Sequence, residues 1–281
     1  MQKKSILKAL GLGALALVAA GTLAACGSKS GASSHTYTVG VASASQKDIF
    51  ENLVAPAVKK EGITLKVKQF SDYTQENPAT QDGSLDLNSF QHIAFLNNWN
   101  KENKGSLVEV GYTLISPFGL YSDKIKDYKN LKDGDTVGVP NDPTNEGRAL
   151  QLLDAIGVIR LKTNAPDSPQ LTDIASYNKK ITIKPIQADQ LAAALPDLAA
   201  ATINTNYVTD QLHTTPEKSA IYIDTDHLSK VSTIYKNVIV VSSKNKDNAD
   251  LKKIITAYQT DEVAKAIEKT GDLPAWDGAK K

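Results

Sequence analysis

From Thr36 onward, short apolar runs typical of β-strands alternate with segments whose apolar residues recur every three or four positions. Alternation on this scale predicts an α/β fold with largely parallel sheets. The expected strands cover residues 37–41, 65–70, 107–110, 136–139, 181–186, 200–203 and 238–241. The expected helices cover residues 49–58, 148–156, 189–195 and 251–258.

The chain length of 281 residues suits two lobes of ordinary size, although no flexible linker separates them. We therefore expect the chain to cross between lobes by extended segments near residues 115–120 and 230–237. The expected boundaries are 36–117 for the first part of lobe 1, 118–232 for lobe 2 and 233–281 for the return to lobe 1. Short crossings of this kind act as hinges, and the space between the lobes is a natural ligand cleft.

The N-terminal region has the pattern of an exported lipoprotein precursor. Three lysines precede an apolar run over 9–25, which is short for a bilayer span of about 20 residues but typical of a signal peptide. The run ends in Leu-Ala-Ala-Cys-Gly, which resembles the lipobox of bacterial lipoproteins, with Cys26 as the acylated residue. We expect a signal peptide over 1–25, a flexible tether over 26–35 and a lipid anchor on the extracytoplasmic face of the cell membrane. The alternative for Cys26 is a buried free cysteine at the end of a membrane helix.

Charge and cysteine content exclude several classes of partner and site. Beyond residue 26 the chain has 29 basic and 31 acidic residues, and such a mildly acidic body argues against nucleic-acid binding. A single cysteine excludes a disulfide framework and any zinc site built from several thiolates.

The sequence has no recognisable enzyme motif. It lacks G-x-S-x-G, H-E-x-x-H, a phosphate-binding glycine loop and a dinucleotide fingerprint. Its four histidines (His35, His92, His213 and His227) are isolated from one another and from the cysteine. We therefore expect neither catalysis, nor a metal site, nor a cofactor.

The most informative segment is 140–148, Pro-Asn-Asp-Pro-Thr-Asn-Glu-Gly-Arg, which follows an expected strand and opens an expected helix. Either Asp142 or Thr144 is suited to cap that helix, and free N–H groups at a helix start favour an anionic ligand group. The chain has 30 lysines but only two arginines, Arg148 and Arg160. An arginine at this place suggests planar, bidentate recognition of a carboxylate. The alternative is a solvated helix residue or a structural ion pair.

Aromatic and amide side chains mark further candidate pocket walls. Tyr73, Phe90 and Phe95 could enclose an apolar side chain, with His92 as a polar group, although such aromatics also occur in ordinary cores. Asn204 follows an expected buried strand and Asn237 precedes another. An amide offers both donor and acceptor to a zwitterion, and the alternative for both residues is turn chemistry.

Taken together, these residues resemble the NlpA-type lipoproteins, the methionine-binding components of ABC importers. The resemblance extends from about residue 37 to 263. Its most specific motifs are FSDY at 70–73, FQH at 90–92, the segment 134–148, INTNY at 203–207 and AYQTDEV at 257–263. It implies a two-lobed periplasmic-binding-protein fold of type II that closes on one amino acid.

The resemblance also implies residue roles and partners. Arg148 would take the ligand carboxylate, and amides would hold the ligand's polar backbone groups. The implied amides are Asn145, Asn204 and Asn237; the implied side-chain pocket is Tyr73, Phe90, His92 and Phe95. The implied partners are methionine, an ABC permease and its ATPase subunits, and the receptor itself is expected to be a monomer.

Two departures from the family pattern affect the expected side-chain preference. Family members often have Lys-Pro-Tyr after the histidine, whereas residues 93–95 are Ile-Ala-Phe, which removes a phenolic donor. Upstream of Asn237 the family commonly has Ser-Pro-Tyr, whereas residues 233–235 are Thr-Ile-Tyr. Methionine remains the first expectation, with another apolar amino acid or a short methionine-containing peptide as alternatives.

Two other classes of function fit a surface lipoprotein. A surface hydrolase would need a nucleophile–base pair or a metal cluster, which the sequence does not reveal. An adhesin-like protein would show an exposed apolar or charged patch and no stabilisation by small ligands.

Overall fold

The computed structural model describes residues 35–224 and 233–278. The predicted signal peptide and Cys26 lie outside these residues. The first strand already begins at His35, which had been expected as the last residue of the tether. No helix in the two described ranges is long and apolar enough to cross a membrane.

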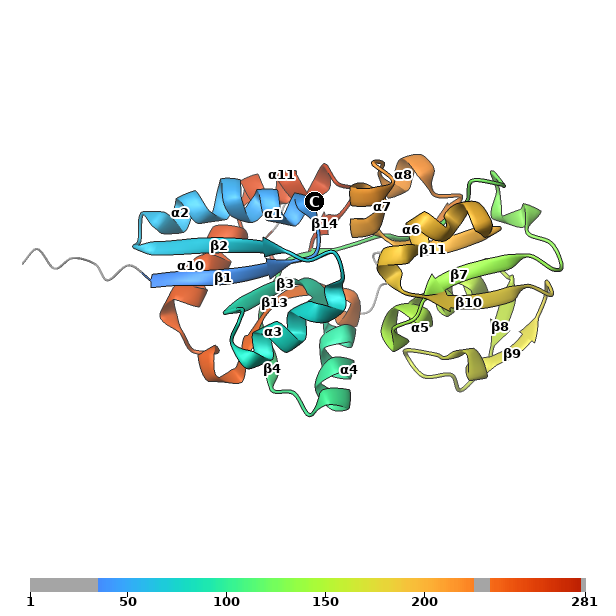
Figure 1. Cartoon of the computed structure of the whole chain (residues 1–281), viewed down its shortest axis with the longest axis horizontal. Coiled ribbons are helices and arrows are strands. Elements are labelled where there is room, and N and C mark those ends of the chain that lie inside the picture. Colours follow the sequence, from blue (N-terminus) through green and yellow to red (C-terminus); the bar gives the residue numbers. More distant parts are fainter. Residues whose placement is uncertain (1–34, 225–232, 279–281) are drawn as a thin grey trace, which may run out of the picture. The chain divides into compact units, whose positions relative to one another are not determined.

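Two five-stranded sheets form two lobes (Figure 1). The first sheet has the strand order β2-β1-β3-β13-β4 and defines the first lobe. Its strands are β1 (His35–Val41), β2 (Ile63–Gln69), β3 (Leu87–His92), β4 (Leu107–Tyr112) and β13 (Asn237–Ser242). The second sheet has the order β10-β7-β11-β6-β12 and defines the second lobe. Its strands are β6 (Phe118–Tyr121), β7 (Thr136–Pro140), β10 (Thr182–Ile186), β11 (Ala200–Asn204) and β12 (Tyr222–Ile223).

Both sheets are mixed, but in each of them four strands run in one direction and a single strand runs against them, so the largely parallel sheets expected from the sequence are confirmed except at β13 and β6. In the first sheet β1 pairs parallel with β2 and β3, but β13 runs antiparallel to β3 and β4. In the second, β7 pairs parallel with β10 and β11, but β6 runs antiparallel to β11 and β12. Each of the antiparallel strands, β6 and β13, is the first strand after the chain has passed from one sheet to the other. Neither is therefore joined to its sheet neighbour by a strand–helix–strand connection, which gives parallel pairs.

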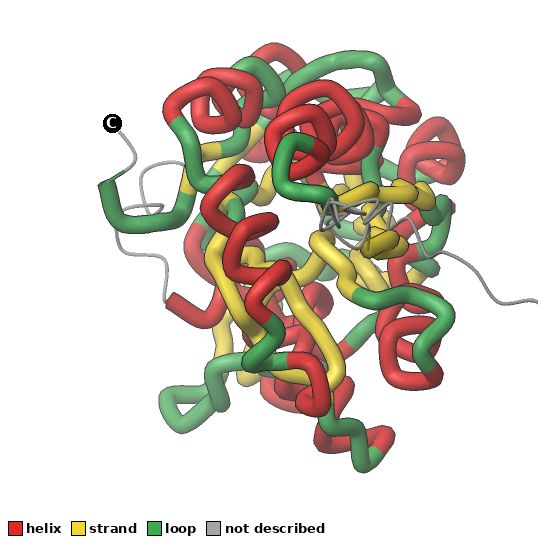
Figure 2. The backbone as a smooth tube through the Cα atoms, turned by 90° about the vertical axis from the view of Figure 1, so that its left-hand side faces the viewer, coloured by secondary structure: helices red, strands yellow, loops and turns green. Residues whose placement is uncertain are grey.

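Helices cover the sheets on both faces (Figures 1 and 2). Above the first sheet in Figure 1 lie α1, α2 and α11, and below it lie α3 and α4. The helices are α1 (Ala44–Ile49), a π-helical turn (Phe50–Val54), α2 (Ala55–Lys59), α3 (Glu76–Asp82), α4 (Ile93–Asn103), α5 (Pro143–Ala155), α6 (Leu191–Ala194), α7 (Thr205–Gln211), α8 (Pro216–Ser219), α10 (Ala249–Tyr258) and α11 (Asp261–Glu268). Short strands complete the fold: β5 (Leu114–Ile115), β8 (Ile159–Leu161), β9 (Ile174–Tyr177) and β14 (Leu273–Pro274).

Strand β13 has consecutive apolar residues because both of its faces are covered. Ile239 and Val241 belong to the main hydrophobic cluster with the helices on one face, whereas Val238 and Val240 pack with Leu96 of α4 on the other. Successive side chains of a strand point to opposite faces, so a strand covered on both faces is apolar throughout.

The chain passes from the first lobe to the second through residues 113–117. At this crossing β5 pairs with β14, which returns from the C-terminal part of the chain. The Thr205 hydroxyl donates to the Pro117 carbonyl at 2.6 Å, and the Ala275 N–H donates to the Thr113 carbonyl at 3.1 Å. Of the second expected crossing, near 230–237, residues 230–232 lie outside the described residues, and Thr233–Tyr235 form a 3₁₀ turn instead of an extended segment. The lobe boundaries expected from the sequence therefore remain predictions.

Candidate ligand-binding site

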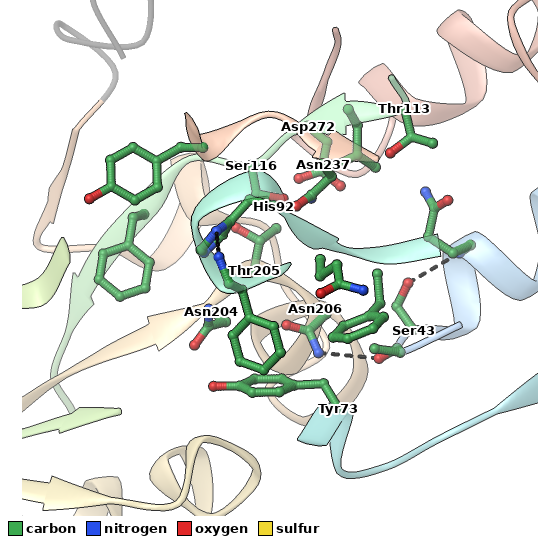
Figure 3. Close-up of a pocket in the computed structure, with 18 of the residues that line it drawn as sticks. Ser43, Tyr73, His92, Thr113, Ser116, Asn204, Thr205, Asn206, Asn237 and Asp272 are labelled. Carbon is green, nitrogen blue, oxygen red and sulfur yellow. Dashed lines mark hydrogen bonds between the residues drawn. The ribbon is translucent and has the colours of Figure 1, made fainter. Parts of the chain in front are cut away.

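The eight candidate pocket residues all line one cavity of about 830 Å³, a volume that includes space open to solvent (Figure 3). They come from both lobes and include residues more than 160 positions apart in the sequence. They are Tyr73, Phe90, His92, Phe95, Asn145, Arg148, Asn204 and Asn237. No cluster of histidine, cysteine or acidic side chains suited to a metal ion occurs within residues 35–224 and 233–278.

The ends of strands and the start of α5 position these side chains. Phe90 and His92 are two residues apart on β3, so they share a face of the strand. Asn237 begins β13 directly opposite His92. Asn145 and Arg148 lie three residues apart on α5, so they occupy one face of that helix.

Arg148 is buried within the second lobe, with only 7% of its side chain exposed. Its Nη2 donates to the Ser116 carbonyl at 2.8 Å and to Asp224 Oδ2 at 3.0 Å. The guanidinium carbon lies 4.9 Å from the Phe118 ring centre and 5.1 Å from that of Tyr235. Arg148 is therefore not a solvated helix residue. It does form a structural ion pair, and its side chain lines the cavity as well.

Asp142 caps α5, which decides between the two capping candidates. Its Oδ1 accepts from the Asn145 N–H at 3.0 Å and from the Thr144 hydroxyl at 2.9 Å. The Tyr73 hydroxyl donates to Asp142 Oδ2 at 2.5 Å from the other lobe. A carboxylate of the chain itself thus occupies this helix N-terminus, and Arg148 is left as the group suited to a ligand anion.

Asn145 connects the amides and the histidine of the cavity. Its Oδ1 accepts from Asn204 Nδ2 at 3.1 Å and lies 3.3 Å from His92 Nε2. His92 Nδ1 accepts from the Phe95 N–H at 3.1 Å, so the ring proton belongs on Nε2, which donates to Asn145. Burial, and then the charge of Arg148, lower the pKa of His92 to about 4. The imidazole is therefore neutral at physiological pH.

Three aromatic rings form a wall at the other end of the cavity, and a fourth ring packs against Tyr73 without lining the cavity. The Tyr73 ring stacks on Phe90 with centres 6.3 Å apart, and Phe95 meets it edge-on at 5.4 Å. Tyr207 of α7 lies 5.9 Å from Tyr73, and these residues belong to one hydrophobic cluster spanning both lobes. The aromatics are thus core and cavity wall together. Burial, and then the charge of Asp142, raise the pKa of Tyr73 well above its ordinary value, so the hydroxyl stays protonated.

Several further cavity residues were missed by sequence reasoning. Among them are Ser116, Phe118, Tyr235 and Asp272, and Asp224, which does not line the cavity, bonds Arg148. Phe118 lies in a segment expected to be a crossing, and no local pattern connects Asp224 or Asp272 with a helix far from them in sequence. Three buried oxygen atoms at the cavity, Ser89 Oγ, Asn204 Oδ1 and Asp272 Oδ1, have no hydrogen-bond partner among the described residues.

Replacing Phe95 by tyrosine is expected to change which amino acid binds best. Phe95 contacts Tyr73, Phe90 and His92 edge-on, so a hydroxyl on its ring adds a polar group to the aromatic wall. Calorimetry against L-methionine, D-methionine, L-leucine and L-phenylalanine should show a changed ranking, with shifts of about 1 kcal/mol, the net contribution of one hydrogen bond. An unchanged ranking would remove Phe95 from the side-chain pocket.

Comparisons with known proteins agree with this architecture. The family model described as NlpA lipoprotein matches residues 37–276. The D-methionine-binding lipoprotein MetQ of Salmonella typhi is 37% identical over 93% of this chain and 96% of its own length. A nutrient-binding protein of Burkholderia cenocepacia, solved bound to methionine, is 38% identical, with a TM-score of 0.78 over 86% of this chain and all of that one. The crystal structure of a methionine-binding protein MetQ is 36% identical, with a TM-score of 0.79 over 86% of this chain and 98% of its own. The similarity covers both lobes and the cavity between them, and the chain belongs to the NlpA lipoprotein family.

Proposed function

We propose that this protein is a lipid-anchored, extracytoplasmic receptor that binds methionine between its lobes and delivers it to an ABC permease. The observation that carries the proposal is the convergence of Arg148, three asparagines and an aromatic wall on one cavity. Relatives named for methionine binding, together with a relative solved with methionine bound, favour this amino acid over others. The family is one of transport receptors, which agrees with a role other than catalysis.

The proposed binding mode follows from the chemistry at the two ends of the cavity. Nη2 of Arg148 is engaged by Ser116 and Asp224, so we assign the ligand carboxylate to the N–H groups of Nη1. The apolar thioether side chain would lie against Tyr73, Phe90 and Phe95. The amides of Asn204 and Asn237 would hold the polar groups on the ligand's α-carbon.

Transport would follow from lobe closure on the ligand. Contacts that join the lobes involve cavity residues themselves: Tyr73 bonds Asp142, and His92 bonds Asn145. Away from the cavity, Asp210 of α7 accepts from the Ala44 N–H at 2.9 Å and from Gln69 at 3.1 Å. A ligand that contacts both lobes binds the closed arrangement better and shifts the population toward it. The permease with its ATPase subunits would then accept the closed form, and a lipid on Cys26 would keep the receptor at the membrane.

The test is a thermal-shift series against the twenty amino acids, D-methionine and a few methionine dipeptides. A ligand that binds only the folded chain stabilises it, by about 2.7 kcal/mol at one hundred times its Kd. We expect the largest rise in Tm with methionine. A larger rise with another apolar amino acid or a dipeptide would correct the ligand but keep the receptor. No rise with any of them would favour an adhesin-like role and reject the proposal.

A further inference from the structure

Asp272 is the one acidic residue among those that line the cavity, and neither the carboxylate clamp nor the aromatic wall uses it. It is only 6% exposed. Its Oδ2 accepts from the Thr270 hydroxyl at 2.8 Å, whereas its Oδ1 has no hydrogen-bond partner among the described residues. In the part of the chain that the structure describes, Asp272 also forms no ion pair.

The backbone holds Asp272 firmly at this place. It follows Gly271, whose φ of +85° turns the chain after α11, and it precedes β14, which pairs with β5 at the crossing between lobes. This φ lies in the left-handed region that favours glycine. The carboxyl of Asp272 is therefore part of a fixed wall, not of a mobile surface loop.

We propose that Asp272 is a ligand-binding residue and that its carboxylate receives the α-ammonium group of the bound amino acid. This inference rests on the proposed function, because it assigns the second charged group of the same ligand. A buried carboxylate is unfavourable unless a cation or several donors compensate it. The ligand's ammonium is such a cation, and Oδ1 is the acceptor left for it.

Ser116 places Asp272 at the correct end of the cavity. The carbonyl of Ser116 accepts from Arg148, and its side chain lies close enough to the Asp272 carboxyl to lower that group's pKa. Figure 3 shows Asp272, Ser116 and Asn237 together, at the end of the view away from Tyr73. In an α-amino acid the carboxylate and the ammonium share one carbon. Arg148 and Asp272 both contact Ser116, so a cation and a carboxylate of the protein lie close together, as the two charged groups of the ligand do.

The ionisation of Asp272 agrees with this role. Burial raises its pKa to about 6, against the lowering effects of Ser116 and Thr270. The carboxyl is therefore mostly ionised at pH 7.5. Glu217 adds a nearby negative charge. The phenols of Tyr121 and Tyr258 also interact with the charge of Asp272, but they stay neutral because burial raises their pKa far above this pH.

The test compares L-methionine with 4-(methylthio)butanoate, which keeps the carboxylate and the thioether but has no ammonium group. Calorimetry on the wild type and on Asp272→Asn gives four affinities. We expect Asp272→Asn to weaken methionine at least about tenfold and to leave the des-amino analogue within about twofold, because only methionine loses a charged hydrogen bond. Glu217→Gln is the matched control, since it removes a nearby exposed carboxylate outside the cavity, and it should leave both affinities within about twofold.

A purely structural role for Asp272 would give a different result. An amide is easier to bury than a carboxylate, so we expect Asp272→Asn to melt at the same or a higher temperature without ligand, although it binds methionine more weakly. Equal losses for both ligands, or unchanged methionine binding, would overturn the assignment. If the wild type binds methionine and no other amino acid, the proposed function stands. This holds whatever the result for Asp272→Asn. If the wild type bound no amino acid, the proposed function would fail, and the Asp272 assignment with it.

Discussion

Replacing Arg148 by alanine is expected to weaken methionine binding at least tenfold, and replacing it by lysine is expected to recover little of the loss. A hydrogen bond between charged groups contributes about 1.5–3 kcal/mol, and about 1.4 kcal/mol corresponds to a tenfold change in Kd. Ser116 and Asp224 hold one edge of the guanidinium, and the rings of Phe118 and Tyr235 flank it. A lysine ammonium keeps the charge, but it has no planar group that could bond Ser116 and Asp224 and still donate to the ligand from a fixed position.

Arg160→Ala is the matched control for this experiment. Arg160 is the only other arginine of the chain, and its side chain is 62% exposed on the surface. We expect methionine affinity within about twofold of the wild type in this variant, because exposed ion pairs contribute little. Unfolding of each variant without ligand must be measured as well, because Arg148→Ala also leaves Asp224 without its cation. Wild-type affinity in a folded Arg148→Ala protein would disprove the carboxylate assignment.

The candidate site was predicted from the sequence where chemistry and local structure coincide. Asn145 and Arg148 follow an apolar strand and open a helix, and Asn204 follows another strand, so their positions at a sheet edge could be expected. The residues that complete the cavity could not. Asp224 reaches Arg148 across 76 positions of sequence, and Asp272 comes from the C-terminal return of the chain. Such contacts depend on how the two lobes interleave, which local patterns do not encode.

Strands with an apolar or an alternating pattern were predicted from the sequence, including β2 and β10, whereas β3, whose buried residues are mostly polar, was missed. Strands β1, β7, β11 and β13 have the runs of apolar residues that buried strands require. Strand β3 has Asn88, Ser89 and Gln91 buried instead, so its sequence does not indicate a strand. Asn77 of α3 compensates two of them, because it bonds Gln91 and Asn88 at 2.7 and 3.1 Å. A polar network of this kind replaces apolar packing and conceals the strand from patterns based on hydropathy.

The cavity is also where the interlobe contacts concentrate. His92 ends β3 of the first lobe, caps α4 and donates to Asn145 of the second lobe. Because its pKa is lowered to about 4, this bond persists across the physiological pH range without the cost of a buried charge. The proposed ligand binding and lobe closure would therefore depend on overlapping groups, which is what a population shift by ligand requires.

Glu76 leads to a prediction about stability whose expected effect is as large as that of Arg148 on binding. It is fully buried near the start of α3, and neither carboxyl oxygen has a hydrogen-bond partner among the described residues. A Cβ added to Gly40 would lie 2.9 Å from Glu76 Oε2 and close to Leu85 and Phe70, so the carboxyl sits in largely apolar surroundings. Burial raises the pKa of Glu76 well above its ordinary value of 4.5, and the folded protein holds this group protonated.

The contribution of Glu76 to stability is therefore expected to fall as the pH rises above 4.5, where the unfolded chain releases this proton and the folded chain keeps it. The loss is about 1.4 kcal/mol for each pH unit between the two pKa values and ends above the folded-state pKa. Glu76→Gln removes the titration, so its free energy of unfolding, measured with urea from pH 5 to pH 8, should exceed that of the wild type by an amount that grows with pH. Other titrating groups, including His92 and Asp272, contribute equally to both proteins and cancel in this difference. Glu102→Gln, at an exposed position of α4, should give a constant difference across the same range. A constant difference for Glu76→Gln too would show that the buried carboxyl is ionised in the folded protein.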